Sequence, residues 1–134
     1  MLKVVIDTNV LVSSLLSSGP PAAIVDLVVD AKITLFYNDL ILCEYYDVLS
    51  REKFGFSNLQ LNRLIDNIVR TGIAIEGASP STFAMIDGDD RIFYDTAVVA
   101  LAYLVTGNKK HFPSKTFVVS PMQFLAIYQK TAGI

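Results

Sequence analysis

The sequence is poor in the residues that most often form disulfides, zinc sites and catalytic triads, with one cysteine and one histidine. Because Cys43 has no second cysteine to pair with, an internal disulfide is excluded and a cytoplasmic location is expected. With His111 as the single histidine, the chain offers little for a Ser–His–Asp or Cys–His nucleophile, or for zinc. The phosphate-binding patterns GxxxxGK[ST] and GxGxxG are both missing.

Long apolar runs are missing too, although 52% of the residues are hydrophobic. Acidic residues, among them Asp7, Asp26 and Glu44, interrupt each run before the roughly 20 residues that a membrane-spanning helix needs. The first residues, MLKVVIDTN, lack the hydrophobic stretch of a signal peptide. We therefore expect no membrane association. A net charge of −2 also argues against a broad cationic surface for duplex DNA.

Strand-like and helix-like patterns alternate along the chain, and we interpret residues 1–134 as one domain. The predicted strands are residues 2–6, 33–37, 73–75, 103–106 and 116–119. The predicted helices are residues 9–16, 22–31, 39–51, 59–70, 91–102 and 121–130. Such alternation is typical of a parallel sheet covered by helices on both faces. Ligands of these sheets bind beyond the carboxyl ends of the strands, so polar residues that follow a strand are candidates for a site.

Four aspartates crowd the stretch IDGDDRIFYD at residues 86–95, namely Asp87, Asp89, Asp90 and Asp95. A turn around Gly88 and capping of the following helix explain one or two of them, whereas four suggest a bound cation. An EF-hand loop does not fit, because the twelfth position counted from Asp87 is Val98 rather than glutamate. Further ligands must then come from distant parts of the chain.

Asp7 and Glu44 are the candidates for those ligands. Asp7 follows the first predicted strand, although a helix N-cap would explain it as well. Glu44 lies in mid-helix with Leu40 and Val48 one turn to either side, on the face expected to meet the core. The alternative for Glu44 is a side chain at the edge of that face whose carboxylate reaches water. Carboxylates without a His/Cys cluster suit Mg²⁺ or Mn²⁺.

A basic loop, TGNKKHF, follows the fourth predicted strand. Thr106 and Asn108 should lie near Asp7, at the carboxyl edge of the sheet. Lys109 and Lys110 are candidates for contacts with RNA phosphates, and an ordinary solvated loop is the alternative.

Four stretches together resemble a PIN domain: VVIDTNVLVSSLL, LILCEYYDVLSREKF, DGDDRIFYDTAVVALAYLVTGNKKHF and VVSPMQFL. The resemblance implies a three-layer α/β/α sandwich with a central parallel sheet of about five strands. It also implies an endoribonuclease that depends on Mg²⁺ or Mn²⁺. The most similar branch comprises bacterial and archaeal toxin components of type II toxin–antitoxin systems, which a cognate antitoxin protein often inhibits.

The resemblance assigns roles to three acidic residues. Asp7 matches the first acidic position of the family and Glu44 the second. Asp90 matches the third, because Phe93 and Ala97 follow it at the expected spacing.

Further residues match supporting positions of the family. Asp95 would be a secondary metal ligand, and Thr8 and Asn9 match the polar pair after the first aspartate. Thr106 matches the polar residue that ends the fourth strand. The chain departs from the family at Asn108, where many PIN domains have a fourth aspartate; asparagine keeps a ligating oxygen but loses the charge.

Three functions are therefore open. The leading one is hydrolysis of RNA by metal-activated water, with no covalent intermediate on the enzyme. An aspartyl-phosphate phosphatase would use Asp7 as its nucleophile, although it needs a second aspartate where this chain has Asn9. The third is an RNA-binding or protein-binding module with a vestigial metal site. A homodimer is expected because the chain has more apolar side chains than one domain is expected to bury. No motif in the sequence identifies the RNA target or the antitoxin.

Overall fold

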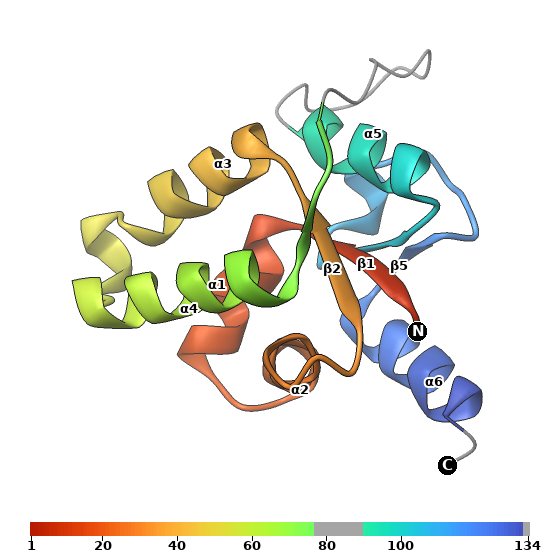
Figure 1. Cartoon of the computed structure of the whole chain (residues 1–134), viewed down its shortest axis with the longest axis horizontal. Helices are drawn as coiled ribbons and strands as arrows, with labels where there is room; N and C mark the ends of the chain where they lie inside the picture. The colour runs from red at the N-terminus through yellow and green to blue at the C-terminus, as the bar shows by residue number, and fades with distance from the viewer. Residues whose placement is uncertain (77–89, 133–134) are drawn as a thin grey trace.

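The computed structural model describes residues 1–76 and 90–132, and its centre is a sheet of five parallel strands in the order β3-β2-β1-β4-β5 (Figure 1). The strands are β1 (Lys3–Ile6), β2 (Thr34–Tyr37), β3 (Ile73–Ala74), β4 (Tyr103–Val105) and β5 (Val118–Val119). All five were predicted, and the predicted parallel pairing is confirmed. Asp87 and Asp89 lie outside the described residues.

The helices that connect the strands are α1 (Thr8–Leu16), α2 (Pro20–Val29), α3 (Asp39–Leu49), α4 (Asn58–Thr71), α5 (Arg91–Ala100) and α6 (Pro121–Thr131). Two short 3₁₀ helices, η1 (Glu52–Phe54) and η3 (Lys109–His111), were not predicted. No single helix in the two described ranges is long and apolar enough to cross a membrane. Only α1 and α2 taken together reach that length and apolar composition, and they are bent by 102° from each other.

Helix ends follow local chemistry. Capping boxes start α4 at Ser57 and α6 at Ser120: each serine hydroxyl accepts from the third helical N–H, and the glutamine side-chain oxygen at that position accepts from the serine N–H. The helix predicted over residues 22–31 was placed two residues late, since prolines fit the first turn of α2 and Ala31 adopts a left-handed φ of 55°. Likewise α5 ends at Ala100, because Leu101 is left-handed with a φ of 54°.

Helices cover both faces of the sheet, which gives the predicted three-layer α/β/α fold. Val4, Val5 and Ile6 of β1 are all fully buried, although successive strand side chains point to opposite faces. Ile6 and Leu35 pack against apolar residues of α2 and α4. Helix α5 contacts β1, β2 and β4 and lies on the other side of the strands from α2 and α4 (Figure 1).

The strand order reverses between β1 and β4. From β1 the chain builds the sheet outward through β2 and β3, and it then returns to add β4 and β5 on the opposite side. Ligands bind at such a reversal, beyond the carboxyl ends of the strands. Ile6 is paired with Val105 in register, so Asp7 and Thr106 leave the sheet side by side.

Candidate metal and active site

Asp7 occupies the N-cap position of α1, but its carboxylate makes no capping bond to that helix. The residue is only 5% exposed. Instead, the Thr106 hydroxyl at the end of β4 donates a hydrogen bond of 2.8 Å to Asp7 Oδ2. Asp7 is therefore an N-cap residue by position, as the alternative had it, but its carboxylate bonds to the end of β4 instead of making the usual side-chain capping bond.

The pKa of the Asp7 carboxyl group depends on its burial and on the acidic residues near it. Burial raises the pKa of its carboxyl group to about 6, from an ordinary 3.8. Hydrogen bonds from the Thr106 hydroxyl and the Thr8 N–H lower this pKa, whereas the negative charges of Asp90 and Glu44 raise it. The fold thus brings together the three acidic residues that the sequence singled out, close enough for their charges to interact through Asp7.

Glu44 reaches the site from α3, where it is half-buried. The Thr8 hydroxyl donates a hydrogen bond of 3.1 Å to Glu44 Oε2, so the residue after Asp7 orients the second carboxylate. The prediction that Glu44 shares the core-facing side of α3 with Leu40 is wrong by one residue. Leu40 is 64% exposed, and the buried residues of the helix are Ile41, Tyr45 and Leu49. Glu44 therefore lies at the edge of the buried stripe, as the alternative had it, and its carboxylate accepts from Thr8.

Asp90 lies at the N-cap position of α5 and, like Asp7, makes no side-chain capping bond to its helix. Its Oδ2 atom is 3.4 Å from Nδ1 of His111 in η3. The Asp90 side chain is 17% exposed. The third carboxylate is thus held between the start of α5 and the loop that follows β4.

Asn9 and Asn108 connect the loops around the site. The Asn9 side-chain oxygen accepts a 3.2 Å hydrogen bond from the Gly107 N–H, which ties α1 to the loop after β4. The Asn108 N–H donates a 3.0 Å hydrogen bond to the Thr106 hydroxyl oxygen. Both asparagines therefore lie at the predicted edge of the sheet, and Asn108 is exposed.

The donor set suits a hard divalent cation, because it consists of carboxylate and hydroxyl oxygens. A positive charge among Asp7, Glu44 and Asp90 would also offset the repulsion that raises the pKa of Asp7. Within residues 1–76 and 90–132, no three His, Cys, Asp or Glu side chains are close enough together to hold a metal ion as they stand. The residues fit the cation in chemistry and charge, and the carboxylates would have to draw closer to bind it.

Comparison with known proteins identifies the family. The family model of the PIN domain matches residues 3–110. This chain belongs to the PIN domain family. It is also 32% identical, over 115 residues, to an uncharacterized protein of Methanocaldococcus jannaschii, in a match that covers 81% of this chain and 72% of the relative. No solved structure matches it at a comparable level of significance. PIN domains are generally nucleases and typically use divalent metals.

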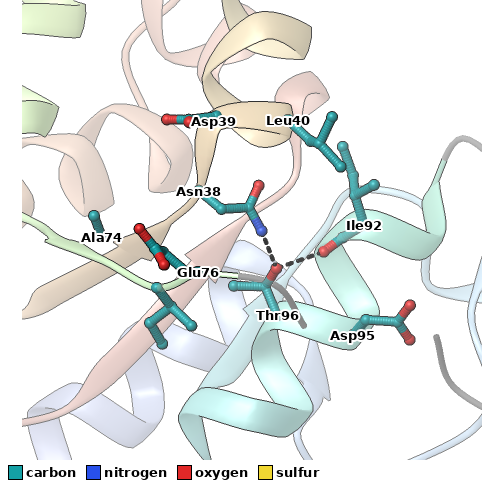
Figure 2. Close-up of a pocket in the computed structure, with 9 residues that line it drawn as sticks. Asn38, Asp39, Leu40, Ala74, Glu76, Ile92, Asp95 and Thr96 are labelled. Carbon is teal, nitrogen blue, oxygen red and sulfur yellow. Dashed lines mark hydrogen bonds between the residues drawn. The ribbon is translucent and has the colours of Figure 1, made fainter. Parts of the chain in front are cut away.

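Asp95 is the acidic residue of this PIN domain whose predicted role finds least support. It is buried, with 6% exposed. Its carboxylate points away from Asn38 and Glu76 in Figure 2. Its role as a secondary metal ligand stays a prediction.

A polar link between α3 and α5 was missed in the sequence. The Asn38 side-chain amide donates a 2.9 Å hydrogen bond to the Thr96 hydroxyl oxygen, and that hydroxyl donates to the Ile92 carbonyl oxygen at 2.7 Å (Figure 2). Asn38 also caps α3 by accepting from the Ile41 N–H, and only this capping role had a sequence signal. The link ties the helix that carries Glu44 to the helix that begins after Asp90.

Two hollows of the PIN domain are lined by residues of the elements that carry the site. One, of about 400 Å³, lies between the start of α3, the end of β3 and α5, and Leu40, Glu76 and Ile92 are among its lining residues. The other, of about 240 Å³, is lined by Lys109, Lys110 and Lys115 together with Phe112 and Pro113. Lys109 Nζ donates a 3.0 Å hydrogen bond to the Gln123 side-chain oxygen at the start of α6. The predicted basic loop is therefore a local concentration of positive charge in an acidic protein.

Proposed function

We propose that this PIN domain is an endoribonuclease that depends on Mg²⁺ or Mn²⁺. The observation that carries the proposal is the buried Asp7 carboxylate, which faces the charges of Asp90 and Glu44 and is held by Thr106. Mutually repelling carboxylates at the reversal point of a parallel sheet contribute nothing to folding, which favours a role in binding a cation.

The side chains divide into those that would hold the cation and those that orient them. Asp7, Glu44 and Asp90 supply the charged oxygens. The Thr106 hydroxyl donates to Asp7 at 2.8 Å and the Thr8 hydroxyl donates to Glu44 at 3.1 Å, so each carboxylate is oriented by a neighbouring hydroxyl. A divalent cation in such a setting activates water and stabilises charge on a phosphodiester undergoing hydrolysis.

Charge distribution favours a single RNA strand as substrate. The net charge is −2, and Lys109, Lys110 and Lys115 together give one loop a local attraction for phosphates. The hollow between α3, β3 and α5 is lined instead mainly by acidic and apolar residues, including Asp39, Glu76 and Ile92. A single strand can bring one phosphate to the lysines while a neighbouring base turns toward that hollow.

The decisive experiment is cleavage of a mixed single-stranded RNA pool by the purified protein in Mn²⁺. EDTA, Asp7→Asn and Asp90→Asn should each abolish cleavage. Asp47→Asn is the matched control, because Asp47 lies on α3 with a side chain that is 74% exposed and paired with Arg51. Loss of cleavage in Asp47→Asn to the same degree would contradict the assigned site.

An RNA-binding or protein-binding module is the second candidate function. Two observations favour it. In the described residues no three His, Cys, Asp or Glu side chains are close enough together to hold a metal ion, and position 108 is asparagine. Folded protein that binds Mn²⁺ or RNA without cleaving RNA would select this alternative. For the phosphatase alternative, an acyl-phosphate trapped on Asp7 would be the decisive product.

A toxin role follows the family resemblance noted in the sequence. We propose that expression of the chain slows growth, and that a cognate antitoxin encoded beside it relieves the effect. Growth of cells that express the wild type or Asp7→Asn tests the first part, because only the wild type should be toxic. The expected homodimer is tested separately by sedimentation.

A further inference from the structure

The loop after β4 contacts carboxylates from two different elements. At its start, the Thr106 hydroxyl donates to Asp7, and the same oxygen accepts from the Asn108 N–H at 3.0 Å. The loop then turns through η3, where the His111 N–H donates to the Asn108 carbonyl oxygen at 3.0 Å. At its far end, His111 Nδ1 lies 3.4 Å from Asp90 Oδ2. Residues 106–111 thus form a bracket between the end of β1 and the start of α5.

The contact with His111 bears on the orientation of Asp90, because the Asp90 side chain forms no capping bond to α5. An aspartate at an N-cap normally turns its carboxylate back onto the first N–H groups of the helix. Asp90 makes no such bond, and its charge acts on Asp7 instead. The contact with His111 comes from a different element, namely the loop whose first residue, Thr106, donates to Asp7.

We propose that His111 is a positioning residue, whose imidazole Nδ1–H holds the Asp90 carboxylate where its charge acts on Asp7, in the proposed cation site. The role rests on the proposed function, since it concerns the same site. It requires a hydrogen on Nδ1, which both the imidazolium ion and one neutral tautomer carry, so it does not depend on the charge of His111. Donors of this kind behind a ligating carboxylate typically change metal affinity about 10–100-fold.

The test is Mn²⁺ affinity, measured from the electron paramagnetic resonance signal of free Mn²⁺. We expect His111→Ala to weaken binding by about tenfold. His111→Asn should bind nearly as well as the wild type, because its side-chain N–H can take the place of Nδ1–H. Thr116→Ala, at an exposed residue further along the same loop, is the matched control and should bind like the wild type. Thermal unfolding checks the fold, which should be retained because the His111 side chain is 39% exposed.

A double-mutant cycle separates positioning from other roles. If His111 acts through Asp90, then His111→Ala should cause no further loss in an Asp90→Asn background. Additive losses, or wild-type affinity in His111→Ala, would overturn the proposal. So would a loss in His111→Asn as large as in His111→Ala, since the imidazole would then bind the ion itself. If Asp90→Asn leaves Mn²⁺ affinity unchanged, the cation site of the proposed function fails, and the role of His111 fails with it.

Discussion

The Thr106 hydroxyl donates a hydrogen bond of 2.8 Å to Asp7 Oδ2, although the two residues are 99 positions apart in the sequence. The bond exists because β1 and β4 are neighbours and both end at the same edge of the sheet. It partly offsets the cost of burying the Asp7 charge, and the same hydroxyl oxygen receives the Asn108 N–H. Thr106 therefore links the central carboxylate to the loop that carries Lys109, Lys110 and His111.

Removing this hydroxyl should impair the site without unfolding the protein. Thr106→Val keeps the shape of the side chain but deletes the donor to Asp7, and hydrogen bonds to charged groups contribute about 1.5–3 kcal/mol. We expect RNA cleavage to fall at least about tenfold and the pKa of Asp7 to rise further. Thr106→Ser should retain most of the activity. Equal rates for valine and wild type would contradict this role.

Asp7 should make the metal-free protein less stable at neutral pH. Its folded-state pKa of about 6 exceeds the ordinary 3.8, so the folded protein binds this proton more tightly than the unfolded chain. The resulting stabilisation is fully present below pH 3.8 and is lost as the pH rises through about 6. In EDTA above that pH, Asp7→Asn should raise the free energy of unfolding by up to about 3 kcal/mol.

Urea unfolding at pH 4 and at pH 7.5 measures this difference. The gain in the free energy of unfolding caused by Asp7→Asn should be smaller at pH 4, where Asp7 of the wild type is largely protonated in the folded state. Added Mn²⁺ should stabilise the wild type but not Asp7→Asn, since only a ligand that binds the folded state stabilises it. A less stable Asp7→Asn in EDTA at pH 7.5 would show that the buried charge carries no such cost.

Asn108→Asp should tighten Mn²⁺ binding. Asn108 is exposed beside the site, and aspartate keeps the backbone N–H that bonds to Thr106. One added negative charge near a protein surface is worth about 1 kcal/mol here, or roughly a fivefold gain in affinity. Titration calorimetry on both proteins checks the sign, and equal or weaker binding by Asn108→Asp would refute the prediction.

Leu101 should carry backbone strain that is unrelated to the function of the protein. It ends α5 with a φ of 54° and is 86% exposed, where glycine is the usual residue. Leu101→Gly should raise the free energy of unfolding by about 1 kcal/mol. As a control, Val99→Gly within α5 should lower it by a similar amount. Thermal unfolding of both variants tests the pair, and destabilisation by Leu101→Gly would show that the leucine makes compensating contacts.

Local chemistry in the sequence was enough to predict the strands, the helices and the main acidic residues of the candidate site. Alternating apolar runs, the serine caps of α4 and α6, and the prolines at the start of α2 act within a few residues, so the order of strands and helices could be predicted. Because parallel strands end at one edge, the meeting of Asp7 with Thr106 could be predicted from their positions after β1 and β4.

Tertiary structure alone decided which way the side chains turn. Asp7 and Asp90 both occupy N-cap positions, where sequence favours a bond to the helix, yet both carboxylates face other elements. The buried stripe of α3 is shifted by one residue from the expected face, which leaves Glu44 beside it and within reach of Thr8. The contact between His111 and Asp90 joins a 3₁₀ turn to a distant helix, and no local pattern encodes it. Such orientations depend on which elements pack together, and that information is spread over the whole chain.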